Sequence, residues 1–283
     1  MAESGTLYVV ATPIGNLGDI GARALELLQQ VTLVAAEDTR HSKRLLDHYG
    51  ISATLLSLHE HNEQARVDSL LTRLQGGASI ALISDAGTPL ISDPGYRLVS
   101  AVHAAGLPVR AVPGPSSLIA ALSVAGQPSD RFCFEGFPPS RRSARRRWLE
   151  TLVGEPRTLI LLESSHRILD CVADLVDVFG AERSATVTRE LSKTFETVRR
   201  DTLGALLGWL EADPVQRKGE FVLVLAGAPE PAGGSHLTVR KEELLEALLA
   251  ELPASRAAAV AARLTGQPRR QLFARALELT DPD

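Results

Sequence analysis

Strand-like runs that end in Gly- or Pro-rich loops and lead into helical segments recur along the first half of this chain. The first is LYVVATPIGNLGDI (7–20), in which an apolar run stops at a bare loop before a helical pattern begins. Further strand-like runs follow at 31–36, 53–58, 78–84 and 108–113, with helical segments between them. This alternation predicts βαβ units and a mainly parallel sheet, with loops gathered at the carboxyl ends of the strands.

A second set of strands and helices begins near residue 130. Its strands are expected at 132–137, 157–163, 184–190 and 220–227, and a Pro/Gly-rich linker, APEPAGGS (228–235), follows them. Beyond the linker the chain is helical, and TGQP (265–268) resembles the tight turn of a helix-turn-helix. The predicted organisation is an α/β domain at 1–125, a second α/β domain at 126–229 and a helical appendage at 236–283.

Bulk composition narrows the class of protein. With 283 residues, 45% of them hydrophobic, the chain can bury the cores of two domains. A formal net charge of −4 argues against a uniformly basic surface but leaves room for local basic patches. Cys133 and Cys171 are far apart and are expected as small buried residues of a protein from a reducing compartment. Because we find no signal peptide and no apolar run long enough to span a membrane, we expect a cytoplasmic protein.

Four loops that follow predicted strands could carry a ligand: ATPIGN, SDAGTP, PGPSS and LLESSHR. None of them has the glycine pattern of a dinucleotide or phosphate loop. Asp85 comes directly after the strand ALIS and could accept hydrogen bonds from a ligand, or instead from the backbone of its own turn. Ser116 and Ser117 open a helix, so helix capping is the simplest role for them.

Five stretches taken together resemble the tetrapyrrole-methylase superfamily: ATPIGNLGDI, AAEDTRHSKRLL, ISDAGTPLISDPG, VPGPSSLIAAL and GQPSDRFCFEGF. The resemblance covers nearly the whole chain and is closest to the branch that methylates a ribose 2′-oxygen in 16S rRNA. It implies two α/β domains with S-adenosylmethionine in the cleft between them, a helix-turn-helix-like appendage and a homodimer. The implied substrate is cytidine 1402 of the decoding centre, presented by the small ribosomal subunit.

The resemblance also assigns cofactor-binding residues by matching motifs. The first loop would hold the uncharged nucleoside and the sulfonium end of the cofactor, so a phosphate fingerprint is not needed. Porphyrinoid-methylating relatives carry a Gly-Asp-Pro turn where this chain reads Ser84-Asp85-Ala86, which favours the RNA branch. In addition, the segment LLESSHRI differs from the sequence more usual in that branch, although it keeps Glu163, His166 and Arg167. The implied cofactor set is Pro13, Asp85, Ala86, Gly87, Ser116, Ser117 and Leu162.

Methyl transfer to a ribose hydroxyl requires a base that shares the hydroxyl proton and a site that aligns the reacting atoms, and no metal is expected. Carboxylates at predicted strand ends are candidate bases, and Lys193 or Arg189 could hold a phosphate or lower the pKa of the hydroxyl. A salt-bridged or solvated role is the alternative for each, and Asp38 could simply cap the following helix. The predicted catalytic residues are Glu37, Asp38, Glu190 and Lys193, with Glu163 as a further candidate base.

Histidines and arginines are the candidates for substrate contact. In HEHNE (59–63), His59 and His61 would share a strand face and could bind zinc, but no third ligand lies nearby in sequence, so we prefer a role at the substrate edge for His59 and Asn62. The five arginines of PSRRSARRRWLE could be a solvated helix start or could contact RNA phosphates. The predicted substrate set is Arg40, His59, Asn62, Arg141, Arg145, Arg146, His166 and Arg167, with a second basic stripe at Arg256, Arg263, Arg269 and Arg270.

Two other functions stay open on the sequence alone. One is a small-molecule methyltransferase of the same fold that acts on a tetrapyrrole, although such an enzyme needs neither the arginine cluster nor the helical tail. The other is a non-catalytic ribosome assembly factor, which would bind no cofactor in its cleft.

Overall fold

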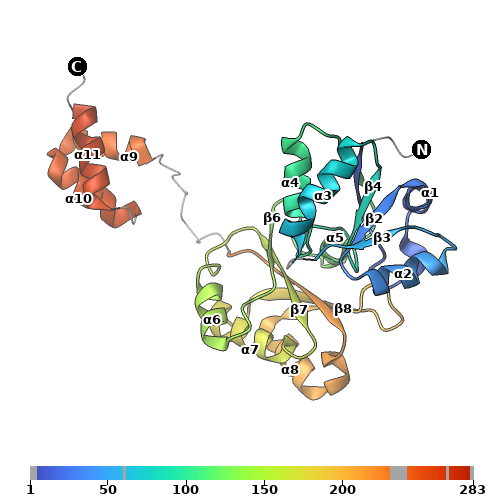
Figure 1. The fold of residues 1–283 in the computed structure, drawn as a ribbon. Coiled ribbons are helices and arrows are strands. Elements are labelled where there is room, and N and C mark those ends of the chain that lie inside the picture. The colour runs from blue at the N-terminus through green and yellow to red at the C-terminus, as the bar shows by residue number, and fades with distance from the viewer. Residues whose placement is uncertain (1–4, 60–61, 230–240, 266–267, 281–283) are drawn as a thin grey trace. The chain divides into compact units, whose positions relative to one another are not determined.

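The chain forms two compact units, Met1–Pro229 and Glu230–Asp283. The computed structural model describes residues 5–59, 62–229, 241–265 and 268–280. The first unit contains two lobes, each built on a five-stranded sheet, and the second unit is helical (Figure 1). The linker residues 230–235 and the expected start of the appendage at 236–240 lie outside the described residues.

The first lobe is built on a parallel sheet in the order β3-β2-β4-β1-β5. Its central strands are apolar throughout because helices cover both faces of the sheet, as expected of a buried parallel sheet. The prediction of a mainly parallel sheet is confirmed here. The strands are β1 (Leu7–Val10), β2 (Leu33–Ala36), β3 (Leu55–Ser57), β4 (Ile80–Ile83) and β5 (Val109–Val112).

Two helices pack on each face of this sheet. Leu27 and Leu28 belong to a cluster on one face, and Leu70, Leu74 and Leu98 belong to a cluster on the other. Each of these leucines is at most 8% exposed, and burial of such a side chain contributes about 1.5–3 kcal/mol. The helices are α1 (Ala22–Gln30) and α2 (Thr39–His48) on the first face, and α3 (Glu63–Gln75) and α4 (Tyr96–Ala104) on the second.

The second lobe is built on a mixed sheet in the order β6-β7-β10-β8-β9. Only β6 and β7 run parallel, and the other neighbouring pairs are antiparallel, so this sheet differs from the parallel sheet of the first lobe. The sequence prediction missed β9. The strands are β6 (Phe132–Gly136), β7 (Thr158–Ser164), β8 (Ser184–Arg189), β9 (Thr197–Thr202) and β10 (Glu220–Leu225).

Helices cover both faces of the second sheet as well. On one face Leu149, Cys171 and Leu206 join a single large core, and Cys133 lies in the same core, so both cysteines are buried as predicted. On the opposite face, α5 packs through Leu118 and Leu122. The helices are α5 (Ser117–Val124), α6 (Arg142–Glu150), α7 (Ile168–Phe179) and α8 (Leu203–Ala212), with short 3₁₀ turns at Leu17–Asp19 and Pro214–Arg217.

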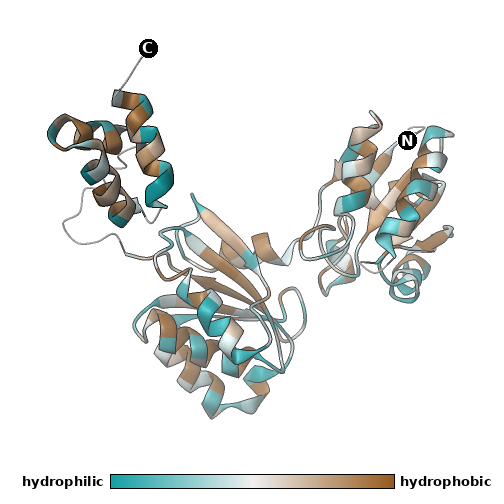
Figure 2. Cartoon of the chain, turned by 60° about the vertical axis from the view of Figure 1, so that its left-hand side comes forward, coloured by the Kyte–Doolittle hydropathy of each residue, from teal (hydrophilic) through white to brown (hydrophobic). Residues whose placement is uncertain are grey.

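The second unit consists of α9 (Lys241–Glu251), α10 (Ala254–Thr265) and α11 (Arg269–Thr280). Its core is made of small and medium apolar residues, among them Leu245, Ala258 and Leu272. Hydrophobic residues line the inner faces of its helices, as they do the strands of both sheets (Figure 2). Gly266 and Gln267 of the predicted TGQP turn lie outside the described residues.

The predicted architecture, two α/β domains followed by a helical appendage, is confirmed. None of the helices within the described ranges combines the length and apolar character that crossing a membrane requires.

Candidate active site

Three loops of the first lobe meet at the carboxyl ends of its strands. Thr12, in the loop after β1, and Gly87, in the loop after β4, form an isolated bridge in which each backbone N–H donates to the other's carbonyl, at 2.8 and 3.1 Å. The Thr88 hydroxyl donates to the carbonyl of Pro115, in the loop after β5, at 3.1 Å. The three Gly/Pro loops predicted from the sequence therefore form one continuous surface.

Gly87 is the residue that permits this close approach. Its φ of +79° lies in the left-handed region, which glycine adopts without steric cost. A Cβ atom at this position would lie 3.3 Å from Cγ2 of Ile14, in the first loop. Any other residue at position 87 would therefore strain the turn and push against the first loop.

A cavity of about 370 Å³ opens between this surface and the second lobe. The first lobe contributes Ile14, Glu37, Asp85, Ala86, Ile91, Ser92, Asp93 and Ser117 to its lining. The second lobe contributes Phe137, Leu162, Glu163, Ser164, Leu191, Glu220, Phe221 and Val222. The volume falls within the range of small-molecule sites, which is about 300–1,000 Å³.

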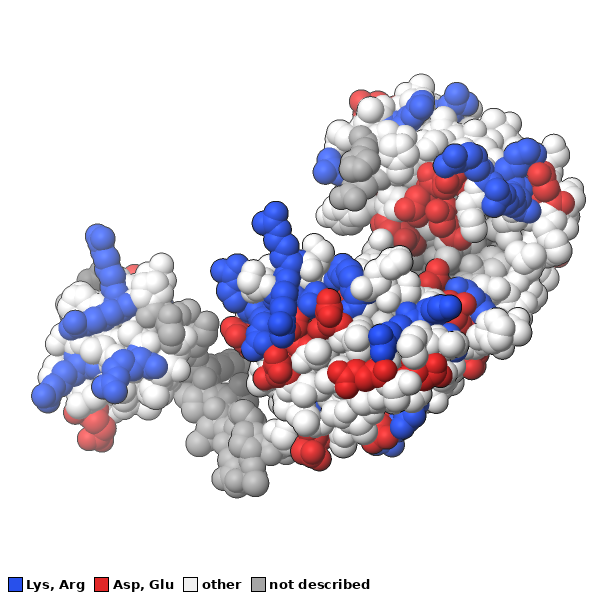
Figure 3. Space-filling view, turned by 90° about the horizontal axis from the view of Figure 1, so that it is seen from below, with Lys and Arg blue, Asp and Glu red and all other residues white. Residues whose placement is uncertain are grey.

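Five carboxylates line this cavity: Glu37, Asp85, Asp93, Glu163 and Glu220. Acidic side chains also gather along the hollow between the two lobes on the face drawn in Figure 3. Burial, with Asp93 and Asp85 nearby, raises the pKa of Glu37 above its usual value. Burial likewise raises the pKa of Asp93, and a hydrogen bond from Ser84 opposes this while the charge of Asp85 adds to it. Such crowding of negative charge favours a cationic ligand.

Glu163, at the end of β7, is held rigidly. Its side chain is 0% exposed and accepts from Arg167 at 3.0 Å and from the backbone N–H of Ser164 at 2.8 Å. Arg167 also donates to the carbonyl of Pro138, which follows β6. The pair therefore fixes the wall of the cavity that the second lobe provides.

The loop between β8 and β9 reaches from the second lobe to the first. The Ser192 hydroxyl donates to the carboxylate of Asp19, and the alkyl chain of Lys193 lies over Gly15. A Cβ at Gly15 would overlap Cγ of Lys193, so this contact leaves no room for a side chain at position 15 unless Lys193 moves. The Lys193 ammonium pairs with Glu190 at 2.9 Å and with Glu220, in the cavity lining, at 3.0 Å.

Comparisons with known proteins agree on one family. A family model described as Tetrapyrrole (Corrin/Porphyrin) Methylases matches residues 6–207, and one described as RsmI C-terminal HTH domain matches residues 239–280. A protein named ribosomal RNA small subunit methyltransferase I from Pseudomonas aeruginosa is 54% identical over 98% of both chains. The protein of that name from Escherichia coli O157:H7 is 52% identical, over 98% of this chain and 96% of its own.

This chain belongs to the ribosomal RNA small subunit methyltransferase I branch of the tetrapyrrole methylase family.

The resemblance read from the sequence is thereby confirmed. Among solved structures, uroporphyrin-III C-methyltransferase from Thermus thermophilus, complexed with S-adenosylhomocysteine, superimposes with a TM-score of 0.53 at 17% identity. The match covers 78% of this chain and 97% of that one, and at this identity it shows a shared fold.

The structure brings most of the predicted cofactor-binding residues together. Asp85, Ala86, Ser117 and Leu162 line the cavity. Pro13 is buried beside the lining residue Ile14. The remaining two positions lie close by, with Gly87 directly after Ala86 and Ser116 lining an adjacent hollow with Ile14 and Leu191. Ser116 occupies the N-cap position of α5 but makes no capping hydrogen bond with its side chain.

The four predicted catalytic residues have different surroundings. Glu37 lines the cavity, whereas Asp38 caps α2 by accepting from the backbone N–H of Arg40 at 2.8 Å, and hydrogen bonds from Arg40 lower its pKa. The backbone N–H of Asp38 donates to Asp85 at 3.0 Å, which ties the two loops together.

Glu190 and Lys193 make contacts that stabilise the β8–β9 loop. Burial would raise the pKa of Glu190, but hydrogen bonds from Lys193 and from the Glu220 backbone hold it below its usual value. Burial alone would lower the pKa of Lys193, but its hydrogen bonds to Glu190 and Glu220 raise that pKa above its usual value. Glu163 also lines the cavity, but Arg167 and the Ser164 backbone hold it, so Glu37 is the best placed of the predicted bases.

Two predicted substrate residues after β3 form a small network of their own. The Asn62 amide accepts from the His59 backbone at 2.9 Å and donates to the carbonyl of Ser57 at 3.3 Å. Asn62 stands at the N-cap position of α3, but its side chain makes no capping bond. His61, the second histidine of the zinc alternative, lies outside the described residues.

Three arginines of the run pair with aspartates of α7: Arg142, Arg145 and Arg146. Arg145 is 3% exposed and its guanidinium contacts Asp174, which is 0% exposed, at 2.7 Å. The prediction that Arg145 contacts RNA is therefore wrong, because that contact would break a buried ion pair. Arg146 pairs with Asp177 and is 38% exposed, and Arg141 is exposed.

Three more predicted substrate residues differ in accessibility. His166 is exposed in the turn after β7. Arg167 is 28% exposed and directs its guanidinium at Glu163 and Pro138, so its observed role is internal. Arg40 is 89% exposed, and because its ion pair with Asp38, at 3.2 Å, lies in solvent, that pair holds it only weakly.

The sequence prediction missed Ile91, Asp93, Phe137 and Glu220 as parts of the cavity. Asp93 stands in the quoted stretch ISDAGTPLISDPG, and its place beside a Pro-Gly turn after a strand was the available signal. Phe137 and Glu220 reach the cavity only because the second lobe folds against the first, which no local pattern reveals.

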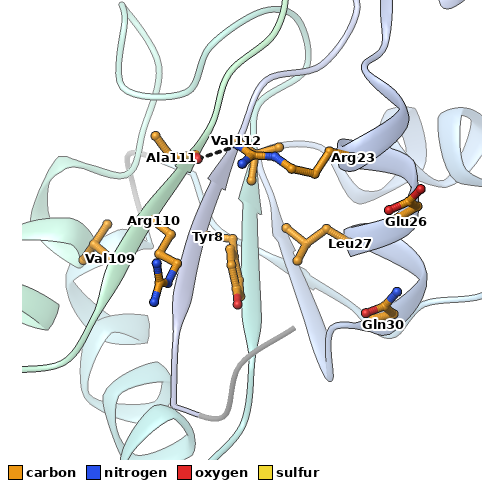
Figure 4. A pocket seen from close by; sticks show the side chains of 9 residues that line it. All are labelled: Tyr8, Arg23, Glu26, Leu27, Gln30, Val109, Arg110, Ala111 and Val112. Atoms are coloured by element: carbon orange, nitrogen blue, oxygen red, sulfur yellow. Dashed lines mark hydrogen bonds between the residues drawn. The ribbon is translucent and has the colours of Figure 1, made fainter. Parts of the chain in front are cut away.

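A second hollow, of about 470 Å³, lies between α1 and the edge strand β5 (Figure 4). Arg23, Glu26 and Gln30 border it on the helix side, and Arg23 donates to the carbonyl of Ala111 at 3.0 Å. Its lining includes no residue of the ATPIGN, SDAGTP or PGPSS loops, all of which the structure describes. Across the described part of the chain, no group of three or more His, Cys, Asp or Glu side chains is arranged to hold a metal ion.

Proposed function

We propose that this protein transfers a methyl group from S-adenosylmethionine to the ribose 2′-oxygen of a decoding-centre cytidine in 16S rRNA. The observation that carries the proposal is the acidic cavity between the lobes, which is lined by several of the predicted cofactor-binding residues. The relatives named ribosomal RNA small subunit methyltransferase I and the fold neighbour complexed with S-adenosylhomocysteine support it.

The residues of the cavity fit this cofactor in charge and polarity. Carboxylates such as Asp85 and Glu163 suit a ligand that carries a sulfonium and an amino group. Ile14 and Leu162 offer apolar contact to a nucleoside, and Ser117 offers a hydroxyl. We propose that Pro13, Asp85, Ala86, Gly87, Ser116, Ser117 and Leu162 hold it.

When bound, S-adenosylmethionine supplies the electrophilic methyl group. The protein's part is to align the ribose hydroxyl and to accept its proton. We assign the base to Glu37, because it lines the cavity and its raised pKa makes it a stronger base than Asp38 or Glu190. In this proposal Lys193 is a positioning residue, which holds the β8–β9 loop against the first loop.

The RNA is a polyanion, so its contacts should be basic and exposed. Arg40 and Arg141 meet this requirement in the first unit, and Arg146 and His166 meet it in part. In the second unit Arg256, Arg263, Arg269 and Arg270 are exposed, and basic side chains predominate on its face in Figure 3. We propose that both units contact the assembled small subunit and that the protein acts as a homodimer.

The test is methyl transfer from labelled S-adenosylmethionine to small ribosomal subunits that lack the modification. The proposal predicts label on one cytidine, at the ribose 2′-oxygen, found by nuclease mapping and mass spectrometry of the nucleosides. Label on a base or on another rRNA would contradict it.

Two control reactions address the other functions. Transfer to a tetrapyrrole in place of subunits would favour the small-molecule enzyme. Failure to bind S-adenosylmethionine in a calorimetric titration, together with binding to subunits, would favour the assembly factor.

A further inference from the structure

Two large apolar side chains stand exposed where the cavity opens to solvent. Phe137, from the second lobe, is 54% exposed, and Ile91, from the first, is 40% exposed, although both line the cavity. Deeper lining residues such as Phe221 and Val222 are 2% and 5% exposed. The exposed pair therefore marks the outer rim, where apolar surface lacks cover by the protein itself.

The backbone directs Ile91 outward. Leu90 and Ser92, on either side of it, have φ of +73° and +63°, values that residues other than glycine rarely adopt. The Leu90 side chain packs in the core of the first lobe, where its Cδ1 would lie 3.1 Å from a Cβ at Gly95. With Leu90 anchored inward, Ile91 points away from that core and into the cavity mouth.

The backbone also directs Phe137. The pairing of β6 with β7 shifts register between Phe134 and Gly136, and Gly136 has a φ of +68°. Such an irregularity re-aims the side chains that follow it. Pro138 is buried and its carbonyl accepts from Arg167, so the turn that carries Phe137 is fixed on both sides.

The two turns lie against each other. A Cβ at Gly136 would lie 3.6 Å from Oγ of Ser92, which is van der Waals contact across the lobes. Phe137 and Ile91 are the immediate neighbours of these residues, and they line the same cavity from opposite lobes.

We propose that Phe137 and Ile91 clamp the base of the target nucleotide, with the Phe137 ring stacked on one face of it. The inference rests on the proposed function, because the cavity lies between two lobes and a nucleotide that leaves the RNA stack can carry its ribose into it. An aromatic ring and an aliphatic side chain suit the two faces of a planar base, whatever its hydrogen-bonding edge. The clamp thus positions the nucleotide but does not choose which base it is.

The test compares variants of the full-length protein with undermodified small subunits as substrate. Phe137→Ala should lower kcat/KM for the subunits about 10- to 100-fold, and Ile91→Ala should lower it less. Phe137→Tyr should restore most of the loss because it keeps the ring. Phe132→Ala is the matched control, since Phe132 is 37% exposed and starts β6, the strand that ends just before Phe137.

A second readout is the Kd for S-adenosylhomocysteine, measured by calorimetry. It should stay within about twofold of the wild-type value in every variant, because the clamp holds the nucleotide and not the cofactor. A Phe137→Ala variant with unchanged kcat/KM would overturn the inference. So would a loss of cofactor affinity in step with the loss of activity, which would assign Phe137 to the cofactor. If the wild-type protein itself does not methylate subunits, that result contradicts the proposed function, and with it the clamp.

Discussion

At the scale of single residues, surroundings decide what each charged side chain can do. Arg145 and Arg40 are both arginines near predicted motifs, yet one is 3% exposed and the other 89% exposed. Asp174, with a fully buried side chain, accepts from both Arg142 and Arg145 at 2.8 Å. The arginine run therefore owes part of its density to the joining of α6 and α7, and only its exposed members remain candidates for RNA.

Asp174→Ala tests this structural role. The change leaves Arg145 charged and buried without its partner, so we expect a loss of about 3–5 kcal/mol in the free energy of unfolding, measured by urea denaturation. Asp177→Ala is the control, because Asp177 is 44% exposed, and it should cost about 1 kcal/mol or less. Unchanged stability of Asp174→Ala would return Arg145 to the list of RNA contacts.

Glu37 gives the second residue-scale prediction. Its raised pKa means that the carboxylate gains a proton as pH falls while ordinary glutamates are still ionised. Since a general base works in its deprotonated form, kcat should fall on the acidic side as pH drops through this raised pKa.

Glu37→Gln should lower kcat by about 10²- to 10⁴-fold and abolish that acidic limb. Glu26→Gln, at an exposed glutamate of α1, should leave both unchanged. The measurement is kcat against pH at saturating donor. An acidic limb that persists in Glu37→Gln would assign the base to another group, of which Asp93 is the nearest candidate by pKa.

At the scale of elements, the loops at strand ends could be predicted from the sequence, whereas the contacts between the lobes could not. The strands of the first lobe follow from apolar runs, because both faces of that sheet are buried. β9 escaped prediction because it is an edge strand that alternates partly buried and exposed positions and contains Arg199, Arg200 and Asp201. Asp85 and Leu162 could be placed at the site by motif, whereas Phe137 depends on a register shift and on the other lobe.

Gly87 provides an element-scale test of the joined loops. Gly87→Ala should raise the Kd for S-adenosylhomocysteine about 10-fold, because the new Cβ would press on Ile14 and disturb the bridge between the first loop and the SDAGTP loop.

Gly106→Ala is a matched control for this test. Gly106 has a similar φ of +68°, and a Cβ added there would meet no other atom within 4 Å, so the variant bears the backbone strain of about 1–2 kcal/mol without touching the site. Both variants should lose similar stability, and only Gly87→Ala should lose cofactor affinity. Equal cofactor affinity in the two would show that the loop junction does not shape the cofactor site.

At the scale of the whole molecule, the two units supply different things. The first unit supplies the cavity between two lobes, and the helical unit has its own core and an exposed set of arginines. The order of predicted strands and helices was enough to predict two α/β domains and a helical tail. The mixed strand directions of the second sheet could not be predicted in this way, because pairing between strands distant in sequence is set by packing rather than by local pattern. The homodimer remains a prediction.

The most direct test is a crystal structure of the protein with bound S-adenosylhomocysteine. We predict the ligand in the cavity between the lobes, in contact with Asp85, Ser117 and Leu162 and within reach of Glu37. A ligand found instead in the hollow between α1 and β5, beside Arg23 and Gln30, would contradict the proposed function, as would lobes too close together at Phe137 and Ile91 to admit a nucleotide.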